Sequence, residues 1–552
     1  MSTEINNERS FAGVQQLSLR SILLGILGSC VITASSIYVA LRLSALPWPT
    51  VFVAVLSMAL LKILGKTTLN EINITQTAMS AGAMVAGGLA FTIPGLWITG
   101  IWKGSAFTPA HVWQVMAVAL AGVIIGTVLS WFLRQRFVDR EALPYPIGEA
   151  AAETIIVGDT GGKKAGVLFG TMGLTAIFTY LRDNLGWIPT AVSSNWLYAK
   201  NFYLGIWVSP MAVGIGYIIG ILYTGVWFLG AVLSYLIIIP LGPALGFFSS
   251  NQTAVNFKNT LGIGLMVGTG AGILIAYLAN IIKRVITSTK IMKEKSEAIQ
   301  LKTKKDIWFW ALIGVTITFA LSIACGIGVI PSLLLMIGVV FAATMAAIIS
   351  GETGINPMEI FGIIILLAVR AIVHIEPTVA FFIAGVVAVA CGYSGDLLFD
   401  YKAGRMLKTN PLAQLISQVA GGIIGAVVAT FALFAVINQF GGLGPDKGLP
   451  AAQAFMVSQM VHGIGDPLVF AISVIIGAVL YLLKVPAMTL GIGVYLPFEI
   501  SAPMFIGGLI RFITDKFRPK SVTMGNIASS GMFGGEGITG VTIAIYRMII
   551  GG

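Results

Sequence analysis

The stretch SILLGILGSCVITASSIYVAL, residues 21–41, contains no charged side chain. A spanning helix needs about 20 predominantly apolar residues, so this stretch is long enough to cross a membrane. It is longer than the apolar part of a cleaved signal peptide and lacks a small-x-small cleavage site. We therefore expect it to stay as the first span, preceded by a polar cytoplasmic tail over residues 1–20.

The composition of the whole chain has the same character. Of 552 residues, 57% are hydrophobic and 10% are charged, whereas soluble proteins carry about 25% charged residues. This leaves too few charges to wet the surface of a soluble globule, which excludes a large soluble catalytic domain. The net charge of +11 is assigned to anionic lipid and to membrane orientation, and no nucleic-acid partner is expected.

Apolar runs separated by short polar breaks continue to the end of the chain. They predict an all-α polytopic membrane protein of about 16 transmembrane helices. The runs cover residues 21–41, 46–64, 72–93, 112–133, 165–182, 205–223, 225–243 and 260–282, then 307–327, 329–349, 360–374, 377–394, 412–437, 467–483, 486–510 and 524–550.

A basic segment divides the chain. Residues 283–306 hold eight basic and three acidic side chains, too many charges to enter lipid. Because basic residues stay in the cytoplasm, this linker and the N-terminus are expected there, in a multi-pass plasma (inner) membrane protein. The linker separates a first transmembrane half, residues 21–282, from a second, residues 307–552.

Short patterns recur in the two halves. Pro146-x-x-Glu149-x-x-x-Glu153 matches Pro411-x-x-Gln414-x-x-x-Gln418, and SPMAVGIGYIIGILY (209–223) matches DPLVFAISVIIGAVL (466–480). We infer an internal duplication, eight spans plus eight, with chance recurrence of Pro, Gly and Ile as the alternative. An even number of spans predicts halves related by a pseudo-twofold axis along the membrane normal.

Two acids follow the prolines of the first pattern. Glu149 and Glu153 lie one helical turn apart in an apolar stretch that is too short to span, which predicts a re-entrant helix that lines the central path. The confined pair would hold a substrate ammonium or a metal, or would share a proton. The alternative is a cytoplasmic surface helix with ordinary exposed acids.

Polar residues in or beside other apolar runs are costly in lipid and mark a pathway by default. Gln414 and Gln418 occupy the matching face in the second half, without charge. Asp396 and Asp400 lie one turn apart at a membrane edge, where a salt-bridged inner loop is the alternative.

Three further candidates lie in or next to spans. Glu499 is bracketed by prolines, the broken-helix pattern of transporters, and Glu536 lies among glycines. For both acids a structural role, capping a broken helix, is the alternative to a substrate ligand. Gln76 opens a span whose glycines suggest close helix packing.

Several stretches together resemble the motif series of the oligopeptide transporter superfamily, nearest its yellow-stripe-like branch and in a prokaryotic type of member. The stretches are Thr68–Thr77 (TLNEINITQT), Leu143–Gly148 (LPYPIG), Gly395–Gly404 (GDLLFDYKAG), Ser417–Val419 (SQV) and Ala528–Gly537 (ASSGMFGGEG). The resemblance implies about sixteen helices in two homologous halves. It also implies proton-coupled uptake of small peptides, or of metal complexes with peptide-like or amino-acid-derived chelators.

The sequence thus favours a secondary active transporter that imports small peptides or peptide-like solutes with protons. Import of metal complexes with amino-acid-derived chelators remains open, as does an intramembrane transferase acting on a lipid-like substrate. No enzyme signature is evident: Gly65-Lys66-Thr67 lacks the first glycine of a phosphate-binding loop. We expect no bound cofactor, with protons as coupling ions and a metal only as part of the substrate. The expected partners are the solute and membrane lipid, and a homo-oligomer is open.

Overall fold

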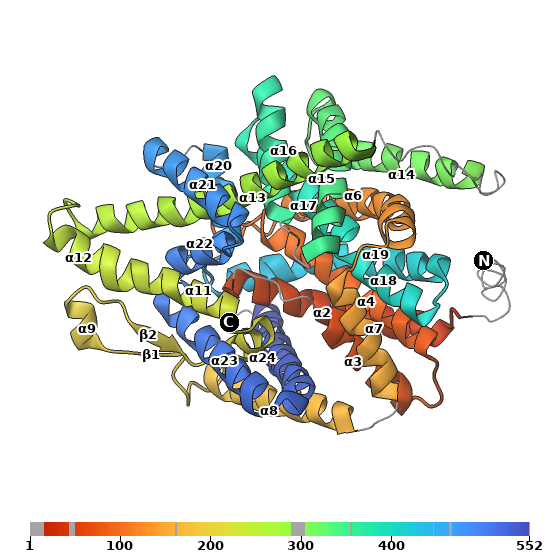
Figure 1. The fold of residues 1–552 in the computed structure, drawn as a ribbon, viewed down its shortest axis with the longest axis horizontal. Coiled ribbons are helices and arrows are strands. Elements are labelled where there is room, and N and C mark those ends of the chain that lie inside the picture. The colour runs from red at the N-terminus through yellow and green to blue at the C-terminus, as the bar shows by residue number, and fades with distance from the viewer. Residues whose placement is uncertain are drawn as a thin grey trace.

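The computed structural model describes residues 16–43, 50–159, 163–288, 304–353, 356, 358–444, 447–462 and 466–550. Nearly all of its regular structure is helical (Figure 1). Two short antiparallel strands, β1 (Ala191–Ser193) and β2 (Gly205–Trp207), form a hairpin in the described chain. The expected all-α polytopic membrane fold is confirmed.

The helices follow the predicted apolar runs. Those before the linker are α2 (Leu19–Leu43), α3 (Thr50–Ile63), α4 (Leu69–Ala90), α5 (Gly95–Ile98), α6 (Pro109–Leu133), η2 (Arg134–Arg140), α7 (Pro146–Asp159), α8 (Lys163–Asp183), α9 (Asn195–Ala199), α10 (Pro210–Ile219), α11 (Ile221–Val232), η3 (Leu233–Ile238), α12 (Ile239–Ala244) and α13 (Asn251–Ser288).

The helices after the linker also follow the runs, except that the run 486–510 is divided and that two helices, over residues 397–407 and 452–462, lie outside the runs. They are α14 (Lys304–Ala324), α15 (Val329–Thr353), α16 (Met358–Ile372), α17 (Pro377–Gly395), α18 (Leu397–Leu407), α19 (Pro411–Gln439), α20 (Ala452–His462), α21 (Pro467–Leu482), α22 (Ala487–Tyr495), α23 (Phe498–Phe517), η5 (Pro519–Ser521) and α24 (Val522–Ile550).

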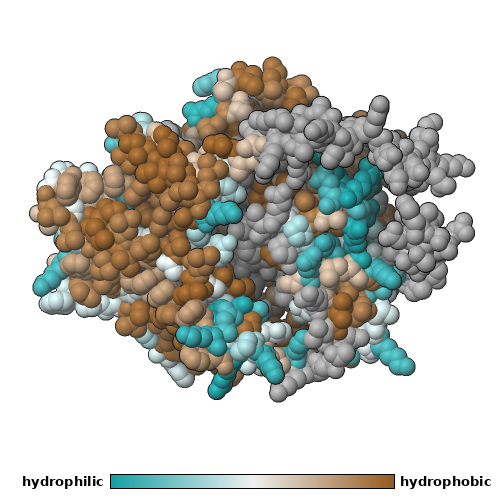
Figure 2. Space-filling view, viewed as in Figure 1, coloured by the Kyte–Doolittle hydropathy of each residue, from teal (hydrophilic) through white to brown (hydrophobic). Residues whose placement is uncertain are grey.

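Seven of the helices in the described residues are long and apolar enough to cross a membrane, and four shorter ones are also apolar. The count of sixteen spans therefore stays a prediction. Large apolar side chains are exposed on the outer helices, for example Leu229 of α11 and Ile475 of α21. Figure 2 shows this as a broad brown surface over the part of the molecule that holds α11, α13 and α21. Such a surface is the one that lipid covers.

Several helices start where the sequence places a capping residue before proline. Thr108, Ser209, Asn410 and Asp466 each precede a proline and accept a hydrogen bond from a backbone N–H of the first turn. The side-chain oxygen satisfies a donor that has no partner in the helix, and proline needs no donor at that position. This local chemistry explains why the predicted starts were close to the observed ones.

The central pair of helices is α4 and α17, which are buried along almost their whole length. They pack against each other in opposite directions, because Gly88 lies against Val389 while Met84 lies against Gly392. Each also has a parallel neighbour: α19 runs along α4, and α6 runs along α17. The contacts are Gly421 to Ala78 and Gly425 to Gly82 in the first pair, and Gly122 to Val389 and Gly126 to Tyr393 in the second.

A second set of matched contacts joins two broken helices. α10 and α11 are separated at Gly220, whose φ is +88°, and α22 and α23 are separated at Leu496 and Pro497. Where the two broken helices cross, glycines of each lie against the backbone of the other. The residue numbers of one set of contacts differ from those of the other set by the same amount throughout. The contacts are Gly216 to Met504 and Gly507 to Val213, matched by Gly493 to Trp227 and Gly230 to Leu490.

These matches relate α4 to α17, α6 to α19, α10 to α22 and α11 to α23. Because α4 and α17 run in opposite directions, the matched helices are inverted relative to each other. The expected axis along the membrane normal is therefore wrong. The contacts also do not follow the predicted alignment, which paired Pro146 with Pro411. The reason is that the even count of eight spans in each half predicted halves of the same orientation, whereas α14, which the sequence assigned to the second repeat, precedes the matched helices and has no matched contact among the described residues.

Candidate functional site

The carboxylate of Asp400 lies at the centre of a buried polar cluster. Asp400 belongs to α18 and is 0% exposed. Gln76 of α4 donates from Nε2 to Oδ1 at 2.7 Å, and the hydroxyl of Ser80, one turn further along α4, donates to Oδ2. The spacing of four residues brings both donors to one face of α4.

Gln414 of α19 completes this cluster. Its Nε2 donates to the backbone oxygen of Asp400 at 2.8 Å and to Oδ1 of Asn73 at 3.0 Å. Asn73 in turn donates to Oε1 of Gln76 at 3.2 Å. The structure thus brings together Gln76, Asp400 and Gln414, which the sequence singled out for separate reasons.

The charge of Asp400 has no counter-ion in the cluster. Its side-chain partners are an amide and a hydroxyl, and no basic residue of the described chain forms an ion pair with it. An isolated carboxylate in a low-dielectric interior is costly unless a proton or a cation neutralises it. The arrangement is suited to a carboxyl group that gains and loses a proton.

Other polar atoms around the cluster lack partners. Asp396 ends α17 and is 4% exposed, and Gln418 lies one turn beyond Gln414 and is 0% exposed. Neither Oδ1 of Asp396 nor either polar atom of the Gln418 side chain has a hydrogen-bond partner among the described residues. Buried polar groups are normally satisfied by protein, water or ligand. Unused hydrogen-bonding capacity is therefore present beside the cluster.

Glu536 of α24 lies in a different setting. Its Oε1 pairs with Nη2 of Arg182 at 2.9 Å, and both side chains are 0% exposed. Ser209 donates to both carboxylate oxygens at 2.9 Å, and the backbone N–H of Met211 donates to Oε2 at 3.0 Å. Glu536 thus caps the start of α10, which favours the structural alternative for this residue.

Glu499 lies in the first turn of α23, beside the hairpin strand β2. Its Cβ is 3.3 Å from the position that a Cβ on Gly205 would occupy, and the residue is half-buried. The predicted break at the prolines is present just before it, between α22 and α23. Glu499 lies in neither the Asp400 cluster nor the Glu536 ion pair.

The first pair of acids is separate from both sites. Glu149 is 44% exposed and pairs with Nζ of Lys402 at 2.9 Å. Ala151 and Ala152 bury the other face of α7, and Ile156 is exposed. This geometry favours the surface-helix alternative for Glu149. The side chain of Glu153 lies outside the described residues.

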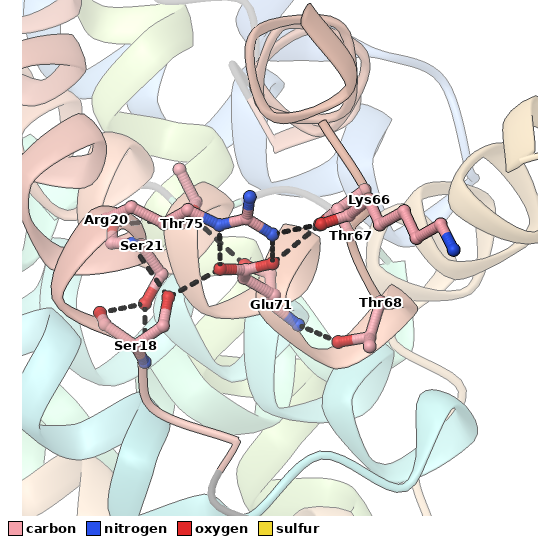
Figure 3. A network of polar contacts seen from close by, with 8 residues as sticks. All are labelled: Ser18, Arg20, Ser21, Lys66, Thr67, Thr68, Glu71 and Thr75. Carbon is pink, nitrogen blue, oxygen red and sulfur yellow. Dashed lines mark hydrogen bonds and ion pairs between the residues drawn. The ribbon is translucent and has the colours of Figure 1, made fainter. Parts of the chain in front are cut away.

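Another acid, Glu71, holds the starts of α2 and α4 together (Figure 3). Arg20 donates to both carboxylate oxygens of Glu71, and Ser18 and Thr67 also donate to it. Thr68 caps α4 by accepting from the backbone N–H of Glu71. Every acceptor position of this acid is used within the protein, so we assign it to structure.

Sequence reasoning missed four residues of these clusters. Asn73 lies three residues before Gln76 and Ser80 lies four residues after it, and that helical period was the available signal. The sequence analysis also did not single out Arg182 or Lys258, which are 2% and 3% exposed. Within the described part of the chain, no group of three or more His, Cys, Asp or Glu residues is placed to hold a metal.

Comparison with known proteins agrees with this architecture. The family described as OPT oligopeptide transporter protein matches residues 16–547. A protein of Haemophilus influenzae whose name describes an oligopeptide transporter is 25% identical, over 92% of each chain. Metal-nicotianamine transporter YSL1 of Arabidopsis thaliana is 25% identical, over 87% of this chain and 82% of its own. The chain therefore belongs to the OPT oligopeptide transporter family.

Proposed function

We propose that this transporter imports small peptides or peptide-like solutes with protons, and that Asp400 carries the coupling proton. The observation that carries the proposal is a fully buried carboxylate with neutral partners only, at the junction of α4, α18 and α19. Because α4 and α19 belong to opposite halves of the chain, a change of charge at Asp400 acts on the contact between the halves.

The protonated and charged forms of Asp400 differ in what they require of their surroundings. The protonated carboxyl can stay buried with the hydrogen bonds from Gln76 and Ser80 in place. The carboxylate needs water or a cationic group of the solute next to it. One proton moving through 100 mV supplies about 2.3 kcal/mol, enough to drive accumulation of a solute.

The neighbouring amides suit a peptide-like solute. Gln76, Gln414 and Gln418 present both donors and acceptors, as a peptide bond does. A metal complex with an amino-acid-derived chelator such as nicotianamine is the second candidate, favoured by the similarity to YSL1. Such a chelator carries the same carboxylate and amine groups, and the metal would enter as part of the solute.

Uptake into proteoliposomes tests the coupling. Labelled dialanine and trialanine, and in parallel a nickel complex of nicotianamine, would be offered with an inward proton gradient. We expect one of these classes to accumulate and the accumulation to collapse when an uncoupler is added. Accumulation that an uncoupler leaves unchanged would contradict proton coupling, and accumulation of the nickel complex alone would assign the second candidate.

The proposed orientation places the N-terminus and the 283–306 linker in the cytoplasm of a plasma-membrane protein. Most of the linker, residues 289–303, lies outside the described residues, so the argument rests on its basic charge. In a Lys295→Cys variant, a membrane-impermeant thiol reagent should label the protein only after permeabilisation. Labelling of Lys295→Cys in intact cells would reverse the orientation.

A further inference from the structure

Lys258 of α13 is a buried cation without a carboxylate partner. It is 3% exposed, and Nζ donates to the backbone oxygens of Tyr495 at 2.8 Å and Val494 at 3.3 Å. No acid in the part of the chain that the structure describes forms an ion pair with it. Burying an ammonium without a counter-charge is costly, so the two carbonyls must compensate for the lost water.

The two carbonyls are open because the helix breaks there. Val494 and Tyr495 end α22, and the next residue, Leu496, is extended. Pro497 follows and has no N–H to continue the helical ladder. The last carbonyls of α22 thus point off the helix end, where the helix dipole is negative.

Aromatic rings complete the surroundings of the ammonium. Nζ lies 4.8 Å from the ring centroid of Tyr235 and 5.6 Å from that of Tyr495. Ring faces attract cations, most strongly where water is excluded. Ser234 also donates to the oxygen of Val494, at 2.9 Å. Carbonyl oxygens and ring faces are together the chemistry that binds an alkylammonium or an alkali cation.

In many transporters the open carbonyls of a broken helix bind a cation taken from solution. We propose that the ammonium of Lys258 is a built-in occupant of such a cation site. The ammonium holds together the junction of α22 and α23, just before Glu499 in the first turn of α23. No sodium ion from solution is then needed at this junction. The inference deepens the proposed function and rests on it only for the transport measurement below.

The matched break in the other half supplies a control. There the end of α10 carries Tyr217, and the cation beside it is Arg511, whose guanidinium carbon lies 5.5 Å from the Tyr217 ring centroid. Arg511 is 22% exposed in its side chain and pairs with Asp515 at 2.9 Å. An Arg511→Ala substitution removes a cation near a helix break without vacating a buried site.

Chemical rescue tests the proposal without knowledge of the solute. Lys258→Ala removes the atoms that propylammonium contains, and 1-propanol is a neutral probe of similar size. We expect propylammonium to raise the melting temperature of purified Lys258→Ala protein, while 1-propanol does not. Wild type and Arg511→Ala should not respond to either probe. Folded Lys258→Ala protein with no response specific to propylammonium would overturn the proposal.

Transport gives the second measurement. Lys258→Ala should lower uptake about tenfold or more, and propylammonium should restore a large part of it. Lys258→Met keeps the volume of the side chain and should stay inactive with or without propylammonium. Wild-type activity in Lys258→Met would overturn the proposal, even if Lys258→Ala fails to fold. If wild type transports none of the solutes, the proposed function fails while the melting test of the cation site still stands.

Discussion

Asp400 of α18 and Glu536 of α24 are both fully buried acids, yet their partners differ. Glu536 pairs with Arg182 and accepts from Ser209 and a helix N-terminus. Asp400 accepts from an amide and a hydroxyl only. Burial alone therefore does not distinguish a structural acid from a functional one, and the charge balance of the partners does. The negative charge of Glu536 is balanced by an arginine, whereas the partners of the Asp400 carboxylate in the described residues are neutral.

The largest expected loss of stability follows removal of one member of the buried ion pair. Glu536→Ala leaves the guanidinium of Arg182 buried beside Asp183 only and removes the cap of α10. Breaking such a pair costs about 3–5 kcal/mol of folding stability. We expect Glu536→Ala to melt far below wild type in a thermal unfolding assay in detergent.

Replacing the charged residues together sharpens this result. Arg182 also pairs with Asp183, so Arg182→Met, Asp183→Asn and Glu536→Leu must be combined to remove every charge of this site. The triple variant should recover much of the stability that Glu536→Ala loses. A triple variant as unstable as Glu536→Ala would show that the cap of α10, and not the charges, is the main contribution.

Loss of Gln414 should have an intermediate effect. Gln414→Leu leaves Oδ1 of Asn73 without its donor in a buried site and removes the additional hydrogen bond to the backbone oxygen of Asp400. A buried group left unsatisfied costs about 1–3 kcal/mol. The same melting assay should place this variant between wild type and Glu536→Ala. Wild-type stability would mean that water replaces the amide and that the cluster is hydrated.

Asp400→Asn should change the folding stability by only about 1 kcal/mol or less, although Asp400 is as buried as Glu536. Asparagine is close to the protonated acid in shape, keeps an oxygen for Gln76 and places a donor opposite the Ser80 hydroxyl. Melting as low as that of Glu536→Ala would show that the charged form of Asp400 is required for folding, and the contrast between the two acids would fail.

The smallest effect is expected at the exposed pair. The side chain of Glu149 is 44% exposed and pairs with Lys402, and such pairs contribute about 0–1 kcal/mol. Glu149→Gln should therefore leave uptake, its pH profile and the melting temperature close to wild type. A clear loss of proton-dependent uptake at normal expression would return Glu149 to the list of coupling groups.

The sequence predicts much of this molecule because lipid imposes simple rules. Apolar length located most of the helices. The cost of polar groups in lipid singled out Gln76, Asp400 and Gln414. Their mutual contact was not predictable, because Gln76 and Asp400 are brought together only by the packing of helices far apart in the sequence. The inverted relation was missed for a similar reason. The apolar run of α14 looks like that of any other span, and only the packing of α14 shows that it lies outside the repeat.

The central claim is that the charge of Asp400 changes during transport. Proteoliposomes that enclose a pH-sensitive dye would measure it, with wild type and Asp400→Asn reconstituted in parallel and a transported solute added outside. For wild type we expect the lumen to acidify as the solute enters. For Asp400→Asn we expect exchange of labelled for unlabelled solute without acidification. Acidification by Asp400→Asn at the wild-type rate would contradict the account and assign the coupling proton to another group.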